Sequence, residues 1–302
     1  MKRRNFLSGL SAATLAAASA GRASFSHAVE TDAADPWLKI SLQQYSFRSL
    51  LSGKNAQMTT LDYPQFAVEK CGIQALEYFN GIFEDKGGDT AYFKELRQRC
   101  DDLDVENQLI LCRNKRAIDD ADANTRAAAA KDYVPWLEAA KILGCHSIRV
   151  DCRSQGKAEE VLKQAVDGLT QLCEIAKSYQ LDIIIENHGN HSSNGAWLAR
   201  LMKTADIDNL GTLPDFGNFR NYDRYQGVKE TLPWARAVCA KVHAFTDDGQ
   251  AKHTDFAKMI RIIKASGFKG YLGIEYEGQN PTPLDGVLMA KCLIEKTLAE
   301  MS

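Results

Sequence analysis

Four residues of types that bind metal ions or transfer protons recur at nearly equal intervals in the second half of the chain. Glu186, Asp215, His243 and Glu275 are separated by 29, 28 and 32 residues. Each lies at or near the end of an apolar run, and the clearest run is the triple isoleucine 183–185 before Glu186. A carboxylate at the end of a buried strand is costly unless a cation or a hydrogen-bond donor meets it. The pattern therefore predicts one site that gathers all four side chains.

The chemistry of these four side chains predicts a site for one divalent metal ion. Three carboxylates and one imidazole form an oxygen-rich donor set, which suits Mn²⁺, Mg²⁺ or Co²⁺ better than a thiolate-seeking metal. Such a cation offsets the repulsion among the carboxylates, and its open coordination positions accept two substrate oxygens. The regular spacing of the four residues supports this prediction more strongly than any single residue does.

The elements that must position these residues are strand and helix pairs, because about 30 residues make one β-strand with its crossover helix. The chain shows eight such alternations with no break in composition and no Gly-rich phosphate loop. We therefore predict a (β/α)₈ TIM barrel, an α/β fold, as a single domain over residues 39–302. Strands are expected at 39–46, 74–79, 105–112, 146–151, 181–189, 210–215, 241–245 and 271–276. Helices are expected at 61–71, 90–103, 121–143, 158–179, 196–204, 228–239, 255–265 and 284–300.

The first 28 residues are predicted to be a twin-arginine (Tat) signal peptide, followed by a leader over 29–38. Arg3 and Arg4 precede Phe6 and Leu7, and an alanine-rich run follows over 10–20. Cleavage is expected after the small-residue triplet 26–28 rather than 18–20. The expected location is periplasmic or otherwise exported; the alternative is a basic N-terminus of a cytosolic enzyme. No other stretch has the roughly 20 apolar residues that a membrane span requires, so none is expected in the mature protein.

Charge and cysteine content narrow the class of protein. The chain has 302 residues, of which 45% are hydrophobic, and a formal charge of −2 that becomes −6 without the four basic residues of the signal. An acidic chain argues against a nucleic-acid partner, because binding to nucleic acid relies on Lys and Arg contacts with phosphates. The eight cysteines form no C-x-x-C pair. We expect them to be reduced thiols that pack as small hydrophobic side chains.

The sequence resembles the xylose isomerase-like TIM-barrel superfamily, and within it the sugar phosphate isomerase/epimerase group. The resemblance covers about residues 39–300 and rests on four motifs: E-N-H-G from Glu186, D-F-G-N-F from Asp215, V-H-A-F from Val242 and G-I-E-Y-E-G from Gly273. It implies that one divalent ion is held by the four residues named first, and that Glu186 and Glu275 also act as catalytic acid and base. The implied function is an isomerase or epimerase of carbohydrate metabolism that moves a proton of a sugar or keto-sugar through a metal-bound enediolate. Whether the chain forms a homo-oligomer is left open.

Further residues are candidates for substrate contacts. His188 follows Glu186 by two residues and is expected to share its face, although a solvated loop histidine is equally compatible. Arg149 lies in an apolar strand and either orients Glu186 or a substrate oxygen, or pairs with Glu77. The predicted substrate-binding residues are His188, Arg149, Lys241, Asn218 and Tyr45.

Three other functions compete with isomerisation. The same residues could serve a metal-dependent lyase or hydrolase that cleaves keto-glycosides, if the enediolate expels a leaving group. A non-catalytic sugar-binding protein on the same fold is less favoured because all four candidate ligands are present. A DNA-repair endonuclease of this superfamily needs extra His and Asp ligands and a basic groove, and a chain with six histidines and net negative charge does not fit it.

Overall fold

A computed structural model describes residues 36–54 and 56–301 of the chain. From residue 37 onward the chain packs as one unit, as expected for a single barrel domain. The predicted export signal over 1–28 and most of the predicted leader over 29–38 lie outside the described residues.

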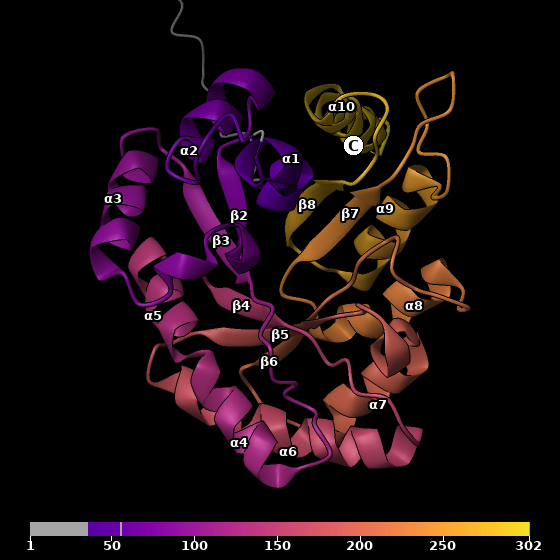
Figure 1. The fold of residues 1–302 in the computed structure, drawn as a ribbon. Helices are drawn as coiled ribbons and strands as arrows, with labels where there is room; N and C mark the ends of the chain where they lie inside the picture. The colour runs from indigo at the N-terminus through magenta and orange to yellow at the C-terminus, as the bar shows by residue number, and fades with distance from the viewer. Residues whose placement is uncertain (1–35, 55, 302) are drawn as a thin grey trace, which may run out of the picture. The chain divides into compact units, whose positions relative to one another are not determined.

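Eight parallel strands form one sheet within the described part of the chain, in the order β6-β5-β4-β3-β2-β1-β8-β7. They are β1 (Leu38–Gln43), β2 (Ala75–Phe79), β3 (Glu106–Leu111), β4 (Ser147–Val150), β5 (Asp182–Glu186), β6 (Leu210–Leu213), β7 (Val238–Val242) and β8 (Gly270–Tyr276). The sheet curls so that its two ends meet, and helices lie around its outer side (Figure 1).

Two backbone hydrogen bonds join the end of β6 to β7 and close the curled sheet. The N–H of Cys239 donates to the carbonyl of Pro214 at 2.9 Å, and its carbonyl accepts from the N–H of Phe216 at 3.0 Å. These bonds form a parallel bridge between Asp215 and Cys239. The predicted (β/α)₈ barrel is confirmed, and Asp215 is fixed beside β7.

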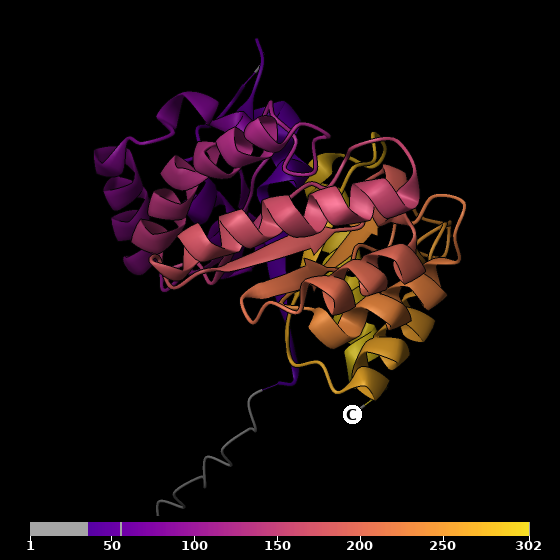
Figure 2. The same cartoon turned by 90° about the horizontal axis from the view of Figure 1, so that it is seen from below.

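Helices follow the strands and cover them; the long helix α6 crosses the outside of the sheet in Figure 2. They are α1 (Arg48–Leu51), α2 (Tyr63–Phe66), α3 (Thr90–Asp101), α4 (Ala123–Asp132), α5 (Val134–Leu143), α6 (Ala158–Lys177), α7 (Gly195–Ala205), α8 (Arg224–Thr231), α9 (Phe256–Ser266) and α10 (Pro283–Ala299). Short 3-10 turns lie at Gln44–Phe47, Asn80–Ile82, Glu84–Lys86, Asn190–Ser193 and Leu232–Trp234, with a π-helix at Ala67–Cys71. The side chain of Asn194 caps α7 by accepting the N–H of Trp197.

Alternation along β5 separates the core from the site. Ile183 and Ile185 pack into the large core between strands and helices. Ile184 points the other way, into a small apolar cluster inside the barrel. Because strand side chains alternate, Glu186 lies on the same inner face as Ile184, at the carboxyl end of the strand. The inner cluster forms an apolar floor beneath it: Leu109, Leu111, Ile184, Leu213, Ala237 and Cys239.

Two expected helices are interrupted near prolines. The expected helix over 228–239 ends at Thr231, because Pro233 lacks an N–H and disfavours helix at the residue before it. The chain then enters β7 at Val238, so the predicted seventh strand is present, but its bounds are 238–242 and not 241–245. The expected helix over 121–143 is likewise divided, at Tyr133, into α4 and α5.

All eight cysteines are free, as expected, and only Cys292 is exposed. In residues 36–54 and 56–301, no helix has both the length and the apolar composition to cross a membrane.

Candidate active site

The ammonium group of Lys241 lies at the centre of three carboxylates. Its Nζ atom lies 2.7 Å from Oε1 of Glu277, 3.2 Å from Oε2 of Glu275 and 3.5 Å from Oδ2 of Asp215. Lys241 is only 4% exposed, and Asp215 and Glu275 are also buried. The residues lie on β7, on and just after β8, and just after β6, so the end of the barrel brings them together.

Glu186 is held on the neighbouring side of the barrel by a second cation. Nη2 of Arg149 lies 2.7 Å from Oε2 of Glu186, while Nη1 donates to Asp151 at 2.6 Å. Nδ2 of Asn218 donates to the other oxygen of Glu186 at 2.7 Å. Burial acts to raise the pKa of Glu186, but Arg149, followed by Lys241, outweighs it and lowers the pKa to about 2. Glu186 is therefore an anion at neutral pH.

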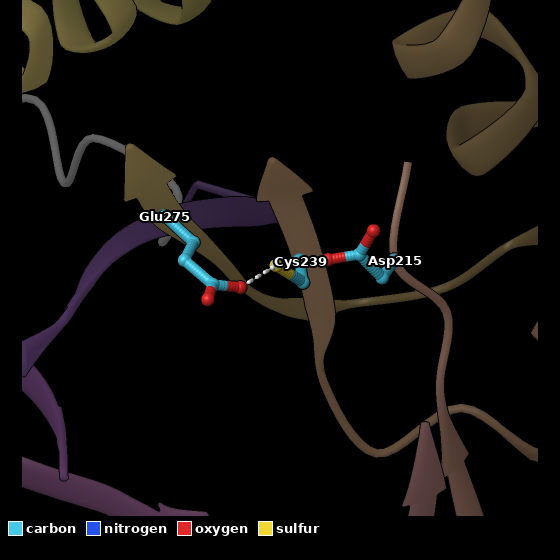
Figure 3. A group of neighbouring side chains, drawn as sticks. All are labelled: Asp215, Cys239 and Glu275. Atoms are coloured by element: carbon cyan, nitrogen blue, oxygen red, sulfur yellow. Dashed lines mark hydrogen bonds between the residues drawn. The ribbon is translucent and has the colours of Figure 1, made fainter. Parts of the chain in front are cut away.

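The pKa of Glu275 is shifted in the opposite direction from that of Glu186. Its strongest influence is burial, which raises its pKa, and the nearby Lys241 offsets this only partly, so the pKa reaches about 8. The neighbouring carboxylates act in the same direction as burial. Sγ of Cys239 donates to Oε2 of Glu275 at 3.2 Å (Figure 3). Two glutamates of one site thus differ strongly in their affinity for a proton.

Asp215 is fixed by its backbone neighbours. The side-chain amide of Asn187 accepts a hydrogen bond from the N–H of Asp215 at 2.7 Å and donates one to the backbone carbonyl of Asp215 at 3.0 Å. These two bonds join the ends of β5 and β6. The N–H groups of Gly217 and Asn218 donate to Oδ1 of Asp215 at 2.6 and 2.8 Å. The other oxygen, Oδ2, is buried and accepts no hydrogen bond. Burial raises the pKa of Asp215.

The donors around Lys241 fit a divalent cation. Asp215, Cys239 and Glu275 each offer a ligand atom, and these atoms lie within 4.8 Å of one another (Figure 3). Oδ2 of Asp215 has a free acceptor position there. Among the described residues that form ion pairs at this end of the barrel, there are five carboxyl groups and three cationic groups. The carboxylates are Asp151, Glu186, Asp215, Glu275 and Glu277, and the cations are Arg113, Arg149 and Lys241.

The predicted metal ligands are not all placed alike. Asp215 and Glu275 belong to the compact donor group, and Glu186 interacts electrostatically with both. His243 lies just after the end of β7, is exposed, and lines a side cavity of 140 Å³ together with Lys241 and His253. Its role as a metal ligand stays a prediction, and within the described part of the chain the compact group contains Cys239 instead.

Four of the five predicted substrate-binding residues line one cavity of 70 Å³ with Glu275. They are Tyr45, Arg149, His188 and Lys241. The fifth, Asn218, contacts Glu186 instead of lining this cavity. One wall is aromatic, because the rings of Tyr45 and Phe79 meet edge to face at 5.1 Å between centroids. Arg149 contacts Asp151 and Glu186, rather than Glu77, which instead accepts a hydrogen bond from Ser41 at 2.6 Å.

Sequence reasoning missed several residues of this site, chiefly Glu277, Cys239, Phe79 and Arg113. Glu277 follows Glu275 by two residues, a spacing that places both on one face when a strand continues, so the E-Y-E pattern carried the signal. Cys239 has the same two-residue relation to Lys241, but the helix expected over 228–239 includes it. Phe79 is the last residue of β2, and Arg113 follows the end of β3. No sequence pattern distinguishes either of them as a site residue.

The chain matches one family of known proteins by sequence and several solved structures by fold. The family model described as Xylose isomerase-like TIM barrel matches residues 66–294. Among curated proteins, none matches the sequence.

Solved structures show the same fold at low sequence identity. L-ribulose 3-epimerase has a TM-score of 0.69 and 13% identity over 86% of this chain and 94% of its own. The IolI protein with a bound zinc atom has a TM-score of 0.68 and 15% identity over 87% and 98%. The 3-keto-D-glucoside 4-epimerase YcjR from E. coli, in its apo form, has a TM-score of 0.66 and 13% identity over 87% and 100%.

Proposed function

Because the chain belongs to the xylose isomerase-like TIM barrel family, we propose that it is an isomerase or epimerase of a sugar or keto-sugar. The observation that carries the proposal is the pair of buried glutamates, Glu186 and Glu275, on β5 and β8 within one carboxylate cluster. Proton transfer at a carbon needs a base and an acid that both reach the substrate. Epimerases of sugars and of a keto-glucoside among the structural neighbours support this substrate class.

In the first step of the proposed reaction, Glu186 acts as the base. It is ionised, because Arg149 lies against one oxygen and Asn218 donates to the other. Glu186 removes the proton from the carbon next to the substrate carbonyl, and the electron pair of the broken C–H bond shifts toward the carbonyl oxygen. The resulting enediolate carries negative charge on its oxygens. Arg149 and Lys241 line the cavity and supply positive charge to stabilise it.

In the second step of the proposed reaction, Glu275 acts as the acid. Its carboxyl group keeps a proton more readily than that of Glu186 because it is buried with weaker compensation. Glu275 donates its own proton: delivery to the opposite face of the same carbon gives an epimer, and delivery to the adjacent carbon gives an isomer. Glu186 is then left protonated and Glu275 ionised. Driving two carboxyl pKa values apart is how one site obtains both an acid and a base.

A divalent ion belongs to the proposal as an additional source of positive charge. Asp215 and Glu275 would hold it, with Glu186 and the predicted ligand His243 nearby, and it would supply Lewis-acid stabilisation of the same substrate oxygens. Export through the twin-arginine signal over 1–28 is also part of the proposal.

Product analysis tests the function. The protein is incubated with a panel of free ketoses and 3-keto-glycosides, with and without Mn²⁺, and the products are resolved by NMR. A new epimer or isomer supports the proposal. Release of the aglycone without an epimer would replace it with a lyase, and binding without any product would leave a sugar-binding protein.

A further inference from the structure

Lys241 occupies the space between the two carboxylates that fit a metal ion. Its Nζ atom lies 3.2 Å from Glu275 and 3.5 Å from Asp215, and both of these residues belong to the compact donor group. Oxygen ligands bind divalent ions such as Zn²⁺ and Mg²⁺ at roughly 2.0–2.2 Å. An ion bound between Asp215 and Glu275 would therefore fall where the ammonium group now lies. Two cations cannot share this space, because they repel strongly at such short range.

The structure also provides a place for a displaced ammonium group. Glu277 is the nearest partner of Lys241, at 2.7 Å, and its side chain is 23% exposed, whereas that of Glu275 is 6% exposed. The stem of Lys241 runs beside Gly217, where an added Cβ would lie 3.0 Å from its Cγ and Cδ atoms. Both residues line the side cavity of 140 Å³. The lysine thus has a more exposed partner and adjacent space to move into.

We propose that Lys241 is a built-in competitor for the metal ion: its ammonium group holds the cation position between Asp215 and Glu275, and a divalent ion binds there only by displacing it toward Glu277. The free carboxylate oxygen of Asp215 is the second observation behind this assignment, because it is buried and aimed at the ammonium without a hydrogen bond. The inference rests on the proposed metal site but not on the identity of the substrate. It implies that the resident cation of the site is lysine when metal is scarce.

Metal affinity of Lys241→Met tests the competition directly. Methionine keeps much of the length of the side chain and removes its charge. Isothermal titration with Mn²⁺ and with Zn²⁺, in the absence of any sugar, is expected to show one ion bound at least about tenfold more tightly than by the wild type, corresponding to about 1.4 kcal/mol. Lys291→Met, which removes a lysine paired with Glu295 far along the chain on α10, should leave the affinity unchanged. Equal or weaker affinity of Lys241→Met, or no binding to either protein, would overturn the proposal.

A second readout covers the case in which Lys241→Met folds poorly, since its carboxylates lose their cation. Thermal unfolding of Lys241→Met and of Lys241→Gln is measured with and without Mn²⁺. Because a ligand that binds only the native state raises its stability, the metal should raise the Tm of both variants more than that of the wild type. Adding Asp215→Asn should abolish this gain. A gain that persists without the Asp215 carboxylate, or no gain in either variant, would contradict the proposal. Substrate is absent from every arm, so failure here leaves the proposed isomerase activity to be judged by its own test.

Discussion

The guanidinium group of Arg149 lies 2.7 Å from the carboxylate of Glu186, and both side chains are buried. The strand register explains the contact, because Arg149 on β4 pairs with Ile184 on β5, two residues before Glu186. Both side chains therefore leave the sheet on the inner face at its carboxyl end. The same guanidinium also binds Asp151, so it anchors two carboxylates at once.

Replacing Arg149 by methionine should destabilise the protein strongly. Removal of one partner from a buried ion pair leaves an uncompensated charge and costs about 3–5 kcal/mol of unfolding free energy. Urea unfolding at pH 7 measures the loss. The matched control is Arg200→Met, which breaks an exposed pair with Glu159 and should cost no more than about 1 kcal/mol. If both variants lost the same unfolding free energy, the ion pair between Arg149 and Glu186 would contribute no more than an exposed pair, which would contradict the prediction.

Asn218 should act by positioning Glu186. Its side-chain amide donates to Oε1 of Glu186, and this hydrogen bond favours the ionised form of the carboxylate. In Asn218→Ala we expect the acid limb of the pH profile of kcat/KM to move to higher pH, since Glu186 then gains a proton more easily. Asn218→Asp would test charge instead of hydrogen bonding, because two carboxylates would then face each other. An unshifted acid limb in Asn218→Ala would remove Asn218 from this role.

Glu77 should make stability depend on pH in a defined direction. Burial raises the pKa of Glu77 to about 7, and Ser41 only partly offsets it, whereas its ordinary value is 4.5. Between these values the unfolded chain loses this proton before the folded chain does, so stability falls as pH rises, by about 3 kcal/mol in total. The neutral variant Glu77→Gln should resemble the wild type near pH 4.5 and be more stable at pH 8. Urea unfolding at several pH values measures this, and a difference between the two proteins that does not change with pH would contradict it.

The spacing of the apolar runs was enough to predict the barrel and the placement of Glu186, Asp215 and Glu275. Each of these residues closes a run whose strand register leaves little freedom, and each reaches the carboxyl end of the sheet as expected. The error lies at β7, where Pro233 ends the preceding helix early and the strand starts at Val238. Because β7 ends at Val242, His243 lies just after the strand, and its role as a metal ligand stays a prediction.

The central position of Lys241 could not be derived from sequence alone. It depends on the register that pairs Lys241 with Glu275 on the neighbouring strand β8, and on the closure that places Asp215, just after β6, beside β7. The difference in pKa between Glu186 and Glu275 has the same origin, because it arises from Arg149 on one side and incomplete compensation on the other.

Solvent deuterium incorporation is the most direct measurement of the central claim, which is that Glu186 and Glu275 move a substrate proton. In D₂O, NMR follows the carbon-bound hydrogen next to the carbonyl across a panel of keto-sugars, for the wild type, Glu186→Gln, Glu275→Gln and the exposed control Glu159→Gln. We predict deuterium at that carbon with the wild type and the control, and exchange slower by about 10²-fold or more in each of the other two variants. Exchange at wild-type rate in Glu186→Gln and Glu275→Gln, or none with the wild type on any keto-sugar, would contradict the account.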